Sequence, residues 1–436
     1  MRESKYNYCM GDHTGMVIYN AKTDGIVALT PELATLFEGS RGDFGKLETL
    51  HPDLYSHLLA KGMLVGDSAD EVGEYIRMVE QGESVADDYT ITVNPTLACN
   101  MKCWYCYESH EKMPAMSAAV AAAVSALIRR VCTSGGVKCL NLSFFGGEPL
   151  LCFDSVVQPL LSEAARLCSA NGLALHVHFT TNAYLLSEKV LGRLEGIDAS
   201  FQITIDGNEN MHNSIRFTKS GEGTYATIIG NIRMALEKGF RVGVRFNYTA
   251  KTLPTFADVL SDFRCVPKEQ RGLLNFNFQR IWQDCGKENG RTEEAVSKLE
   301  GLFDGEGFVV KPANDYFVPY CYADKKNTVV VNYNGDLYKC TARDFTPKNK
   351  EGVITADGDL VWNKRGRDRL AIRFGGDTCR KCRIYPICHG GCSQMKLEMP
   401  DSGACPKGYG EEQIADIIRK RALFILGEYK KCAKRK

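Results

Sequence analysis

The sequence of 436 residues has no long apolar run and almost no net charge. None of its apolar stretches approaches the roughly 18–20 residues needed to cross a bilayer, and residues 1–6 lack the apolar core of a signal peptide. The net charge of +1 gives no reason to expect nucleic acid or a membrane as a partner. Repeats and low-complexity segments are also absent. We therefore expect a cytoplasmic, globular protein of two or three domains.

The eighteen cysteines are unusual for such a protein. In a reducing compartment, disulfides do not explain them, and clustered cysteines there more often bind metal or carry out redox chemistry. Eight cysteines are scattered singly, and we expect them to act as small buried hydrophobes: Cys9, Cys132, Cys139, Cys152, Cys168, Cys265, Cys285 and Cys432. The other ten form two tight patterns.

The middle of the chain alternates between short β-branched or aromatic runs and helical segments. The expected strands are 89–96, 138–145, 173–181, 199–205, 240–248 and 273–281, and the expected helices are 114–133, 154–171, 187–195, 224–238, 255–264 and 292–304. Such alternation predicts parallel βαβ units. Six units form either an open doubly wound sheet or a partial barrel, and periodicity leaves both open.

The two ends of the chain follow different patterns. Near the N-terminus we expect a hairpin over residues 15–29, a helix from its cap Thr30 to Gly39, a helix over 51–61 and a linker over 81–88. After residue 312 the helical regularity disappears, apart from a helix over 411–430. A cysteine-rich region with a hairpin over 328–339 takes its place, and we expect ligand bonds to hold this region together.

The first cysteine pattern lies directly after the strand expected at 89–96. Cys99, Cys103 and Cys106 place three thiolates at CxxxCxxC spacing on one loop. Tetrahedral zinc and ordinary four-iron clusters take four protein ligands. Three ligands leave one iron open to a substrate or cofactor. A zinc site with a distant fourth ligand is the alternative.

This loop resembles the signature of the radical S-adenosylmethionine (SAM) superfamily, with an aromatic residue, Tyr105, before the last cysteine. Gly146, Gly147, Glu148 and Pro149 end the second expected strand, as the GGEP segment does in that superfamily, where it binds the amino group of SAM. Glycine allows the backbone to approach a ligand closely, and Glu148 offers an acceptor for an ammonium group.

Two later segments extend the resemblance. Residues 180–186 are similar to the segment that meets the ribose of SAM, with Asn182 as the matching polar residue. Asp206, His212 and Arg216 resemble the DGxxxxHxxxR pattern of the peptide-modifying branch, which implies that Arg216 reaches the carboxylate of SAM. A surface turn with a local ion pair is the alternative for these three residues.

The resemblance implies a partial (β/α)6 barrel and a [4Fe-4S] cluster that binds SAM. An electron from the reduced cluster cleaves SAM to a 5′-deoxyadenosyl radical, which abstracts a hydrogen atom. The difficult chemistry then belongs to the cofactor, and the protein positions the substrate and excludes water. The resemblance gives no separate catalytic side chain.

The second pattern resembles the SPASM domain, which carries auxiliary clusters in radical SAM enzymes that modify peptides. The resemblance implies one auxiliary [4Fe-4S] cluster on Cys379, Cys382, Cys388 and Cys405, and most of a second on Cys321, Cys340 and Cys392. A structural zinc ribbon is the alternative.

Two departures from that domain matter. Residues 322–327 contain no further cysteine, so either a remote group completes the Cys321 cluster or one of its iron atoms is open to a substrate thiolate. Thr341 and not aspartate follows Cys340, and Asp344 lies three residues on. Anaerobic sulfatase maturases have an aspartate base directly after this cysteine, so the departure weakens formylglycine formation without excluding it.

The resemblance therefore implies an α/β fold with three parts. These are a small N-terminal α+β, winged-helix-like domain (1–85), the radical SAM core (89–310) and the SPASM domain with a C-terminal helix (311–436). The N-terminal domain either binds a leader peptide as an added strand or serves only as a cap. The implied partners are a precursor peptide and a small electron donor such as flavodoxin or ferredoxin. We expect a peptide maturase that forms a thioether, carbon–carbon or ether crosslink with loss of two hydrogens. The alternatives are an anaerobic sulfatase-maturating enzyme and a non-catalytic iron–sulfur carrier.

Overall fold

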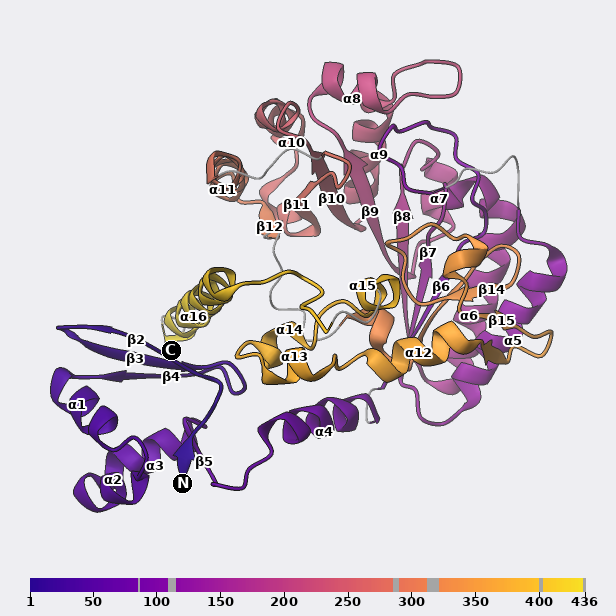
Figure 1. The fold of residues 1–436 in the computed structure, drawn as a ribbon. Coiled ribbons are helices and arrows are strands. Elements are labelled where there is room, and N and C mark those ends of the chain that lie inside the picture. The colour runs from indigo at the N-terminus through magenta and orange to yellow at the C-terminus, as the bar shows by residue number, and fades with distance from the viewer. Residues whose placement is uncertain (85–86, 109–114, 285–289, 312–320, 400–402, 434–436) are drawn as a thin grey trace. The chain divides into compact units, whose positions relative to one another are not determined.

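The computed structural model describes residues 1–84, 87–108, 115–284, 290–311, 321–399 and 403–433. The chain packs as two compact units, which are described separately (Figure 1). The larger unit contains the described residues within 86–315 and 326–367, and the smaller contains those within 1–85, 316–325 and 368–436. Among these residues, no helix combines the length and the apolar character needed to span a membrane.

An eleven-stranded sheet organises the larger unit. Its strands are β6 (Asp88–Val93), β7 (Cys139–Phe144), β8 (Ala174–Thr181), β9 (Asp198–Ile205), β10 (Arg241–Tyr248), β11 (Leu274–Arg280), β12 (Val309–Lys311), β13 (Thr328–Val331), β14 (Asp336–Tyr338), β15 (Gly352–Ile354) and β16 (Leu360–Trp362). Strands β6 to β12 are parallel and neighbour one another in chain order. A doubly wound sheet reverses its strand order, so this order agrees with the partial barrel.

Helices cover one face of the parallel strands (Figure 1). They are α5 (Ala118–Thr133), α6 (Gln158–Asn171) with a π-helical turn before it (Phe153–Val157), α7 (Glu188–Gly192), α8 (Glu209–Ile215), α9 (Tyr225–Glu237), α10 (Phe256–Phe263) and α11 (Gly290–Gly305). Short 3-10 turns lie at Pro149–Cys152, Leu253–Thr255, Lys268–Leu273 and Pro347–Asn349. Alternate strand residues, such as Phe144, Phe179 and Phe201, are buried in the core. The intervening residues face away from the helices because successive side chains on a strand point to opposite faces.

The hairpin expected over residues 328–339 is confirmed as β13 and β14, but it also extends the main sheet. Strand β13 pairs in parallel with β6, with Thr328 opposite Thr90 and Val331 opposite Val93. Strands β14, β15 and β16 continue the sheet in antiparallel order. The sequence did not indicate this pairing.

The smaller unit contains an antiparallel sheet of three strands, β2 (Asn7–Asp12), β3 (Gly15–Asn20) and β4 (Gly25–Leu29). A two-stranded sheet joins β1 (Arg2–Glu3) to β5 (Leu64–Val65). The helices from this end of the chain are α1 (Pro31–Gly39), α2 (Phe44–Leu50), α3 (Pro52–Ala60) and α4 (Glu71–Ser84). The expected cap of α1 is confirmed, because the Thr30 hydroxyl accepts a hydrogen bond from the Leu33 amide at 3.4 Å.

The described residues of the cysteine-rich C-terminal region within 321–325 and 368–436 belong to the same smaller unit, whereas residues 326–367 belong to the larger one. The part in the smaller unit contains the turn Tyr322–Asp324 and the helices α12 (Lys364–Ile372), α13 (Asp377–Lys381), α14 (Tyr385–Cys388), α15 (Ser393–Glu398) and α16 (Glu411–Ala433), of which α12 begins before residue 368. Tyr6, Tyr19 and Tyr75 from the N-terminal end share one apolar cluster with Tyr385 and Ile418. The two ends of the chain therefore have a common core.

Three N-terminal elements differ from the expectation. Strand β2 and helices α2 and α4 had not been predicted, and residues 81–84 of the expected linker lie in α4. Helix α4 forms although its last turn is polar, because Val72, Tyr75 and Ile76 pack into the shared core. Residues 85 and 86 lie outside the described residues.

The scattered cysteines are mostly buried or half-buried, as expected. Cys132, Cys152 and Cys168 are buried, whereas Cys9 and Cys139 are half-buried. The expectation is wrong for one of them, since Cys265 is exposed. Cys285 lies outside the described residues, as does the side chain of Cys432.

Candidate functional site

Cys99, Cys103 and Cys106 lie on the loop that follows β6. Cys99 is buried, Cys103 half-buried and Cys106 exposed. A tight turn holds the last two, since the Cys106 amide donates to the Cys103 carbonyl at 3.0 Å. The three thiols therefore lie on one short segment at the carboxyl ends of the parallel strands, which is the end where open α/β sheets bind ligands.

The glycine segment predicted to bind SAM crosses this loop backbone to backbone. The amides of Gly147 and Glu148 donate to the carbonyls of Thr96 and Ala98 at 3.2 and 2.9 Å. A Cβ atom on Gly147 would lie 2.2 Å from the Ala98 oxygen, and one on Gly146, with φ +96°, would lie 2.5 Å from the Thr96 oxygen. The glycines were expected to make room for a ligand. The structure gives them another role, because they let the loop of the three cysteines approach and so set the distance between the two motifs. Their contact with SAM stays a prediction.

Glu148 lies where the two backbones cross, and its side chain is fully buried. Its carboxylate accepts hydrogen bonds from the Leu150 amide at 3.0 Å, the Thr181 hydroxyl at 2.7 Å and the Asn182 amide at 2.8 Å. Burial raises the pKa of this carboxyl, and the donors oppose that rise. A carboxylate has about four acceptor positions, so one remains available to an ammonium group. Pro149 fixes the backbone after Glu148 by opening a 3-10 turn.

Asn182 connects three motifs that are far apart in the sequence. Its amide nitrogen donates to the Asn100 side chain at 2.7 Å and lies 3.8 Å from the Cys99 sulfur. Its backbone amide binds Glu148. The side-chain oxygen accepts a hydrogen bond from the Tyr184 amide at 3.0 Å, so both ends of the side-chain amide are held in place. The structure thus brings the cysteine loop, the GGEP segment and the end of β8 together.

Arg216 and Tyr105 lie in a second buried network beside the cysteine loop. The Tyr105 hydroxyl donates to Asp206 at 2.7 Å and accepts from Arg216 at 2.7 Å and from Asn247 at 3.3 Å. Asp206 and Arg216 form an ion pair at 3.6 Å. The alternative for these residues was a surface turn with a local ion pair. The ion pair is present, but it is not on the surface, because Asp206 and His212 are fully buried and Arg216 is 8% exposed. Burial lowers the pKa of His212. The Nδ1 atom of its ring accepts a hydrogen bond from the Asp206 amide.

These residues fit a three-thiolate cluster with a SAM-binding site beside it. Burial raises the pKa of Cys99 to about 12 and also raises the pKa of Cys103 and Cys106, while Arg216 opposes the rise at all three. A coordinating metal deprotonates a thiol outright. The Arg216 Nε and one Asp206 oxygen are buried without a hydrogen-bond partner among the described residues, so the network retains a donor and an acceptor. No three His, Cys, Asp or Glu side chains of the described residues are grouped to hold a single metal ion.

Four of the C-terminal cysteines line one cavity of about 390 Å³ within the smaller unit, namely Cys379, Cys382, Cys388 and Cys405. The loop beside it has three consecutive residues with positive φ, His389, Gly390 and Gly391, at 56°, 80° and 79°. The Cys379 thiol donates to the Gly390 carbonyl at 3.4 Å. Burial raises the pKa of Cys388 to about 11. Four cysteines around a cavity match the ligand number of an ordinary four-iron cluster.

The remaining three predicted ligands belong to different units. Cys321 and Cys392 lie in the smaller unit and Cys340 in the larger. Within the smaller unit, the Ser393 hydroxyl donates to Asp324, and Arg369 donates to Ser393 at 2.9 Å. These bonds connect the segment after Cys321 with the segment after Cys392. The second auxiliary cluster stays a prediction.

The sequence analysis missed an aromatic rim beside the cysteine loop. The rings of Tyr107 and Trp282 stack at 6.3 Å, and the Arg343 guanidinium lies 5.8 Å from the Trp282 ring centre. Trp104 and Trp282 are 57% and 63% exposed. The signal that could have identified this rim was a tryptophan inside the cysteine motif and another shortly after β11.

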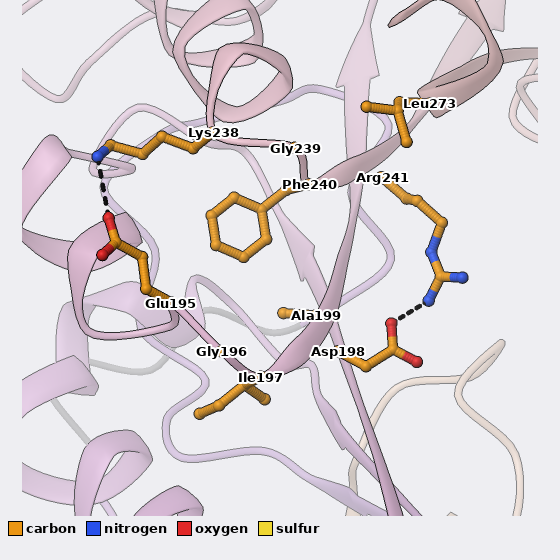
Figure 2. A pocket seen from close by; sticks show the side chains of 10 residues that line it. All are labelled: Glu195, Gly196, Ile197, Asp198, Ala199, Lys238, Gly239, Phe240, Arg241 and Leu273. Atoms are coloured by element: carbon orange, nitrogen blue, oxygen red, sulfur yellow. Dashed lines mark hydrogen bonds and ion pairs between the residues drawn. The ribbon is translucent and has the colours of Figure 1, made fainter.

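A pocket of about 410 Å³ lies at the other end of the sheet, where β9 and β10 begin (Figure 2). Its charged side chains pair with one another, Lys238 with Glu195 at 3.1 Å and Arg241 with Asp198. None of its lining residues belongs to the predicted site. The candidate site is therefore the carboxyl end of the barrel.

Comparisons with known proteins agree with this architecture. Residues 93–256 match the Radical SAM superfamily. The cysteine-type anaerobic sulfatase-maturating enzyme of Clostridium perfringens (strain 13 / Type A) is 22% identical over 339 residues, which cover 70% of this chain and 88% of that enzyme.

Two solved structures share the fold. Native anSMEcpe with bound AdoMet and the Cp18Cys peptide has a TM-score of 0.59 at 18% identity, covering 79% of this chain and 99% of that chain. SuiB of Streptococcus suis bound to its precursor peptide SuiA has a TM-score of 0.52 at 14% identity, covering 93% of this chain and 99% of that chain.

The domain match, the strand order and the three-cysteine loop after β6 point to one family, and they set aside a non-catalytic iron–sulfur carrier. That family uses a [4Fe-4S] cluster and SAM. The chain carries a radical SAM domain over residues 93–256, which makes it an enzyme, and it shares the fold of anSMEcpe and SuiB.

Proposed function

We propose that this enzyme modifies a ribosomally made peptide and forms a crosslink within it, with net loss of two hydrogens. The observation that carries the proposal is the contact of Asn182 with both Glu148 and the cysteine loop. This contact unites the predicted ligands of the cluster with the predicted ligands of SAM. Both solved structures described above contain a bound peptide, which supports a peptide as the substrate class.

The residues of the chain have separate tasks in this proposal. Cys99, Cys103 and Cys106 hold the cluster, Glu148 accepts the ammonium group of SAM, and Arg216 binds its carboxylate. When bound, the cluster and SAM supply the one-electron chemistry that removes an unactivated hydrogen atom from the substrate.

The positions of these ligands depend on the protein around them. Gly146 and Gly147 fix the loop, and Asn182 orients both the loop and Glu148. The buried network around Tyr105 keeps water away from the base of the site. Preorganised groups of this kind place reacting atoms within the short distances that hydrogen transfer needs.

We also propose two auxiliary [4Fe-4S] clusters. The cavity lined by Cys379, Cys382, Cys388 and Cys405 supports the first. Cys321, Cys340 and Cys392 would hold most of the second, whose fourth ligand is a remote group or a substrate thiolate. Such clusters would accept the electron that the substrate releases when the crosslink closes. A small electron donor, such as flavodoxin or ferredoxin in the cytoplasm, would reduce the SAM cluster.

Residues 1–85 would bind the leader of the precursor peptide. Strands β2 and β4 are the two edges of the three-stranded sheet, and an edge can pair with an added peptide strand. Three helices, α1 to α3, follow the sheet, whereas the sequence predicted two. The N-terminal part therefore resembles a winged-helix domain more closely than expected.

Oxidation of a cysteine or serine to formylglycine is the second candidate. The 22% identity with the sulfatase-maturating enzyme over 339 residues favours it, whereas Thr341 in place of an aspartate base argues against it. A short cysteine-containing reading frame beside the gene would favour the crosslink, and a sulfatase gene would favour formylglycine.

The test is anaerobic reconstitution with a candidate precursor peptide, followed by mass spectrometry of the peptide and the nucleoside. A crosslink lowers the peptide mass by two hydrogens and appears together with 5′-deoxyadenosine. An unmodified peptide that was bound by the enzyme, or an aldehyde product that reacts with hydrazide, would contradict the crosslink proposal.

A further inference from the structure

A cationic row crosses the face of the sheet that the helices do not cover. Phe246 of β10 packs against Phe256 and Phe303 of the helices, with ring centres 4.6 and 5.4 Å apart. Successive residues of a strand point to opposite faces, so the neighbouring Arg245 lies on the uncovered face. Strand register places Arg245 between Thr204 of β9 and Asn277 of β11. Lys311 of β12 lies opposite Asn277 and completes the row.

This row lies at the level of the predicted SAM site. Thr181 is opposite Ile203, so Asn182, the next residue, is level with Thr204. Arg245 is therefore two strands away from Asn182, or about 10 Å at the usual strand spacing. Asn182 binds Glu148 through its backbone amide, so the row lies beside the predicted SAM site.

Arg245 is also connected to the cysteine loop. Its Nε donates to the Asn247 side chain at 2.8 Å, and Asn247 donates to the Tyr105 hydroxyl at 3.3 Å. These bonds fix the plane of the guanidinium, whose two terminal nitrogens have no hydrogen-bond partner among the described residues. A guanidinium held at one edge presents its other edge as a fork, which suits a carboxylate.

The charges on this face do not balance. Asp206, the carboxylate that acts on Arg245, is already engaged by Tyr105 and Arg216. Neither Arg245 nor Lys311 has an ion-pair partner within the described part of the chain. Burial lowers the pKa of Arg245, and Tyr107, Tyr105 and Asp206 only partly oppose this. A half-buried cation without a counter-ion is costly unless a ligand supplies the negative charge.

The ammonium of Lys311 acts on the same face. Burial lowers the pKa of His178 on β8, and the charge of Lys311 lowers it further. The neutral side chain of Asn277 separates the two cations. Lys311 is exposed, whereas Arg245 is half-buried, so Arg245 is the cation that indicates an anionic ligand.

We propose that Arg245, assisted by Lys311, binds a carboxylate of the substrate peptide, so that the segment entering the barrel carries an acidic residue beside the residue that reacts. The inference rests on the proposed peptide-modifying function and specifies its substrate class. SAM also has a carboxylate, but its amino-acid end is assigned to Glu148 and Arg216, and Arg245 is a further cation that this assignment does not use. Arg245 is in this view a specificity-determining residue.

The test compares two small peptides on the full-length, reconstituted and SAM-loaded enzyme. Acetyl-Gly-Asp-Gly-amide should bind about tenfold or more tightly than acetyl-Gly-Asn-Gly-amide in calorimetry, as expected for hydrogen bonds between charged groups. Arg245→Gln should abolish this preference while changing the affinity for SAM by less than about twofold. Arg245→Lys should retain part of the preference. The matched control is Arg241→Gln, which makes the same change on the same strand but at an exposed pair with Asp198, and it should retain the full preference.

Several outcomes would overturn the inference. A preference that survives in Arg245→Gln, or that is absent from the wild type, refutes it. Loss of SAM affinity by the same factor assigns Arg245 to SAM and also refutes it. If both Arg245 variants lose iron or secondary structure while Arg241→Gln does not, the role is structural. Because the peptides bind without turnover, absence of any modified precursor contradicts the proposed function separately.

Discussion

Gly147→Ala tests whether the backbone crossing of the two motifs sets the geometry of the site. The new Cβ would lie 2.2 Å from the Ala98 oxygen, whereas ordinary contact begins at 3.4 Å, so the loop of the three cysteines must move by about 1 Å. A displacement of about 1 Å can cost on the order of 10²-fold in rate. The bond from the Glu148 amide to Ala98 would also weaken, at a cost of about 1 kcal/mol.

The assay is the rate of 5′-deoxyadenosine formation under dithionite, with iron content and circular dichroism on the same samples. Gly136→Ala is the matched control, because no atom lies within 4 Å of its Cβ position. We expect a rate about 100-fold lower for Gly147→Ala and a wild-type rate for the control. A wild-type rate for a folded, iron-loaded Gly147→Ala would refute the reasoning.

Three further substitutions have clear expected results. Cys103→Ala should abolish 5′-deoxyadenosine formation because the cluster loses one of three ligands, and persistence of that activity would contradict the assignment. Cys379→Ala should lower the iron content and abolish the peptide product while some SAM cleavage remains. Its control is Cys265→Ala, at an exposed cysteine. Equal iron content in the two variants would contradict the auxiliary cluster. Phe246→Ala should lower the free energy of unfolding by about 3–5 kcal/mol, measured by denaturant titration, because Phe246 is fully buried; a loss below 1 kcal/mol would mean that the core collapses to fill the space.

Local sequence patterns were sufficient for the parallel strands β6 to β11, but not for the short parallel strand β12, which no predicted range contains. In β10 the apolar residues Val242, Val244, Phe246 and Tyr248 alternate and are all buried, and the observed strand lies within the predicted range 240–248. Turns and polar residues bound each such run, so the limits of the strands could be read from the sequence. Helix α4 could not, because its stability comes from contacts with distant tyrosines of the shared core and not from its own composition.

The motifs identified the candidate site, but not the contacts between its residues. The bond from Tyr105 to Asp206 spans 101 residues, and it depends on the order and register of β6 to β10. Arg245 was missed for a related reason. A charged residue between Val244 and Phe246 fits the ordinary alternation of polar and apolar residues in a strand, so it did not mark a site. Only the register showed that it lies level with Asn182.

The pairing of β13 with β6 has a consequence for engineering. A graft that exchanged everything after residue 311 for the corresponding region of a relative would remove β13 to β16 from the barrel sheet. The edge of β6, which leads into the cysteine loop, would then present unpaired backbone groups and invite aggregation. Chimeras that keep residues 326–367 with the barrel preserve the hydrogen bonds from Thr328 to Val331 along β6. Modularity in this enzyme therefore follows the sheet and not the order of the cysteine motifs.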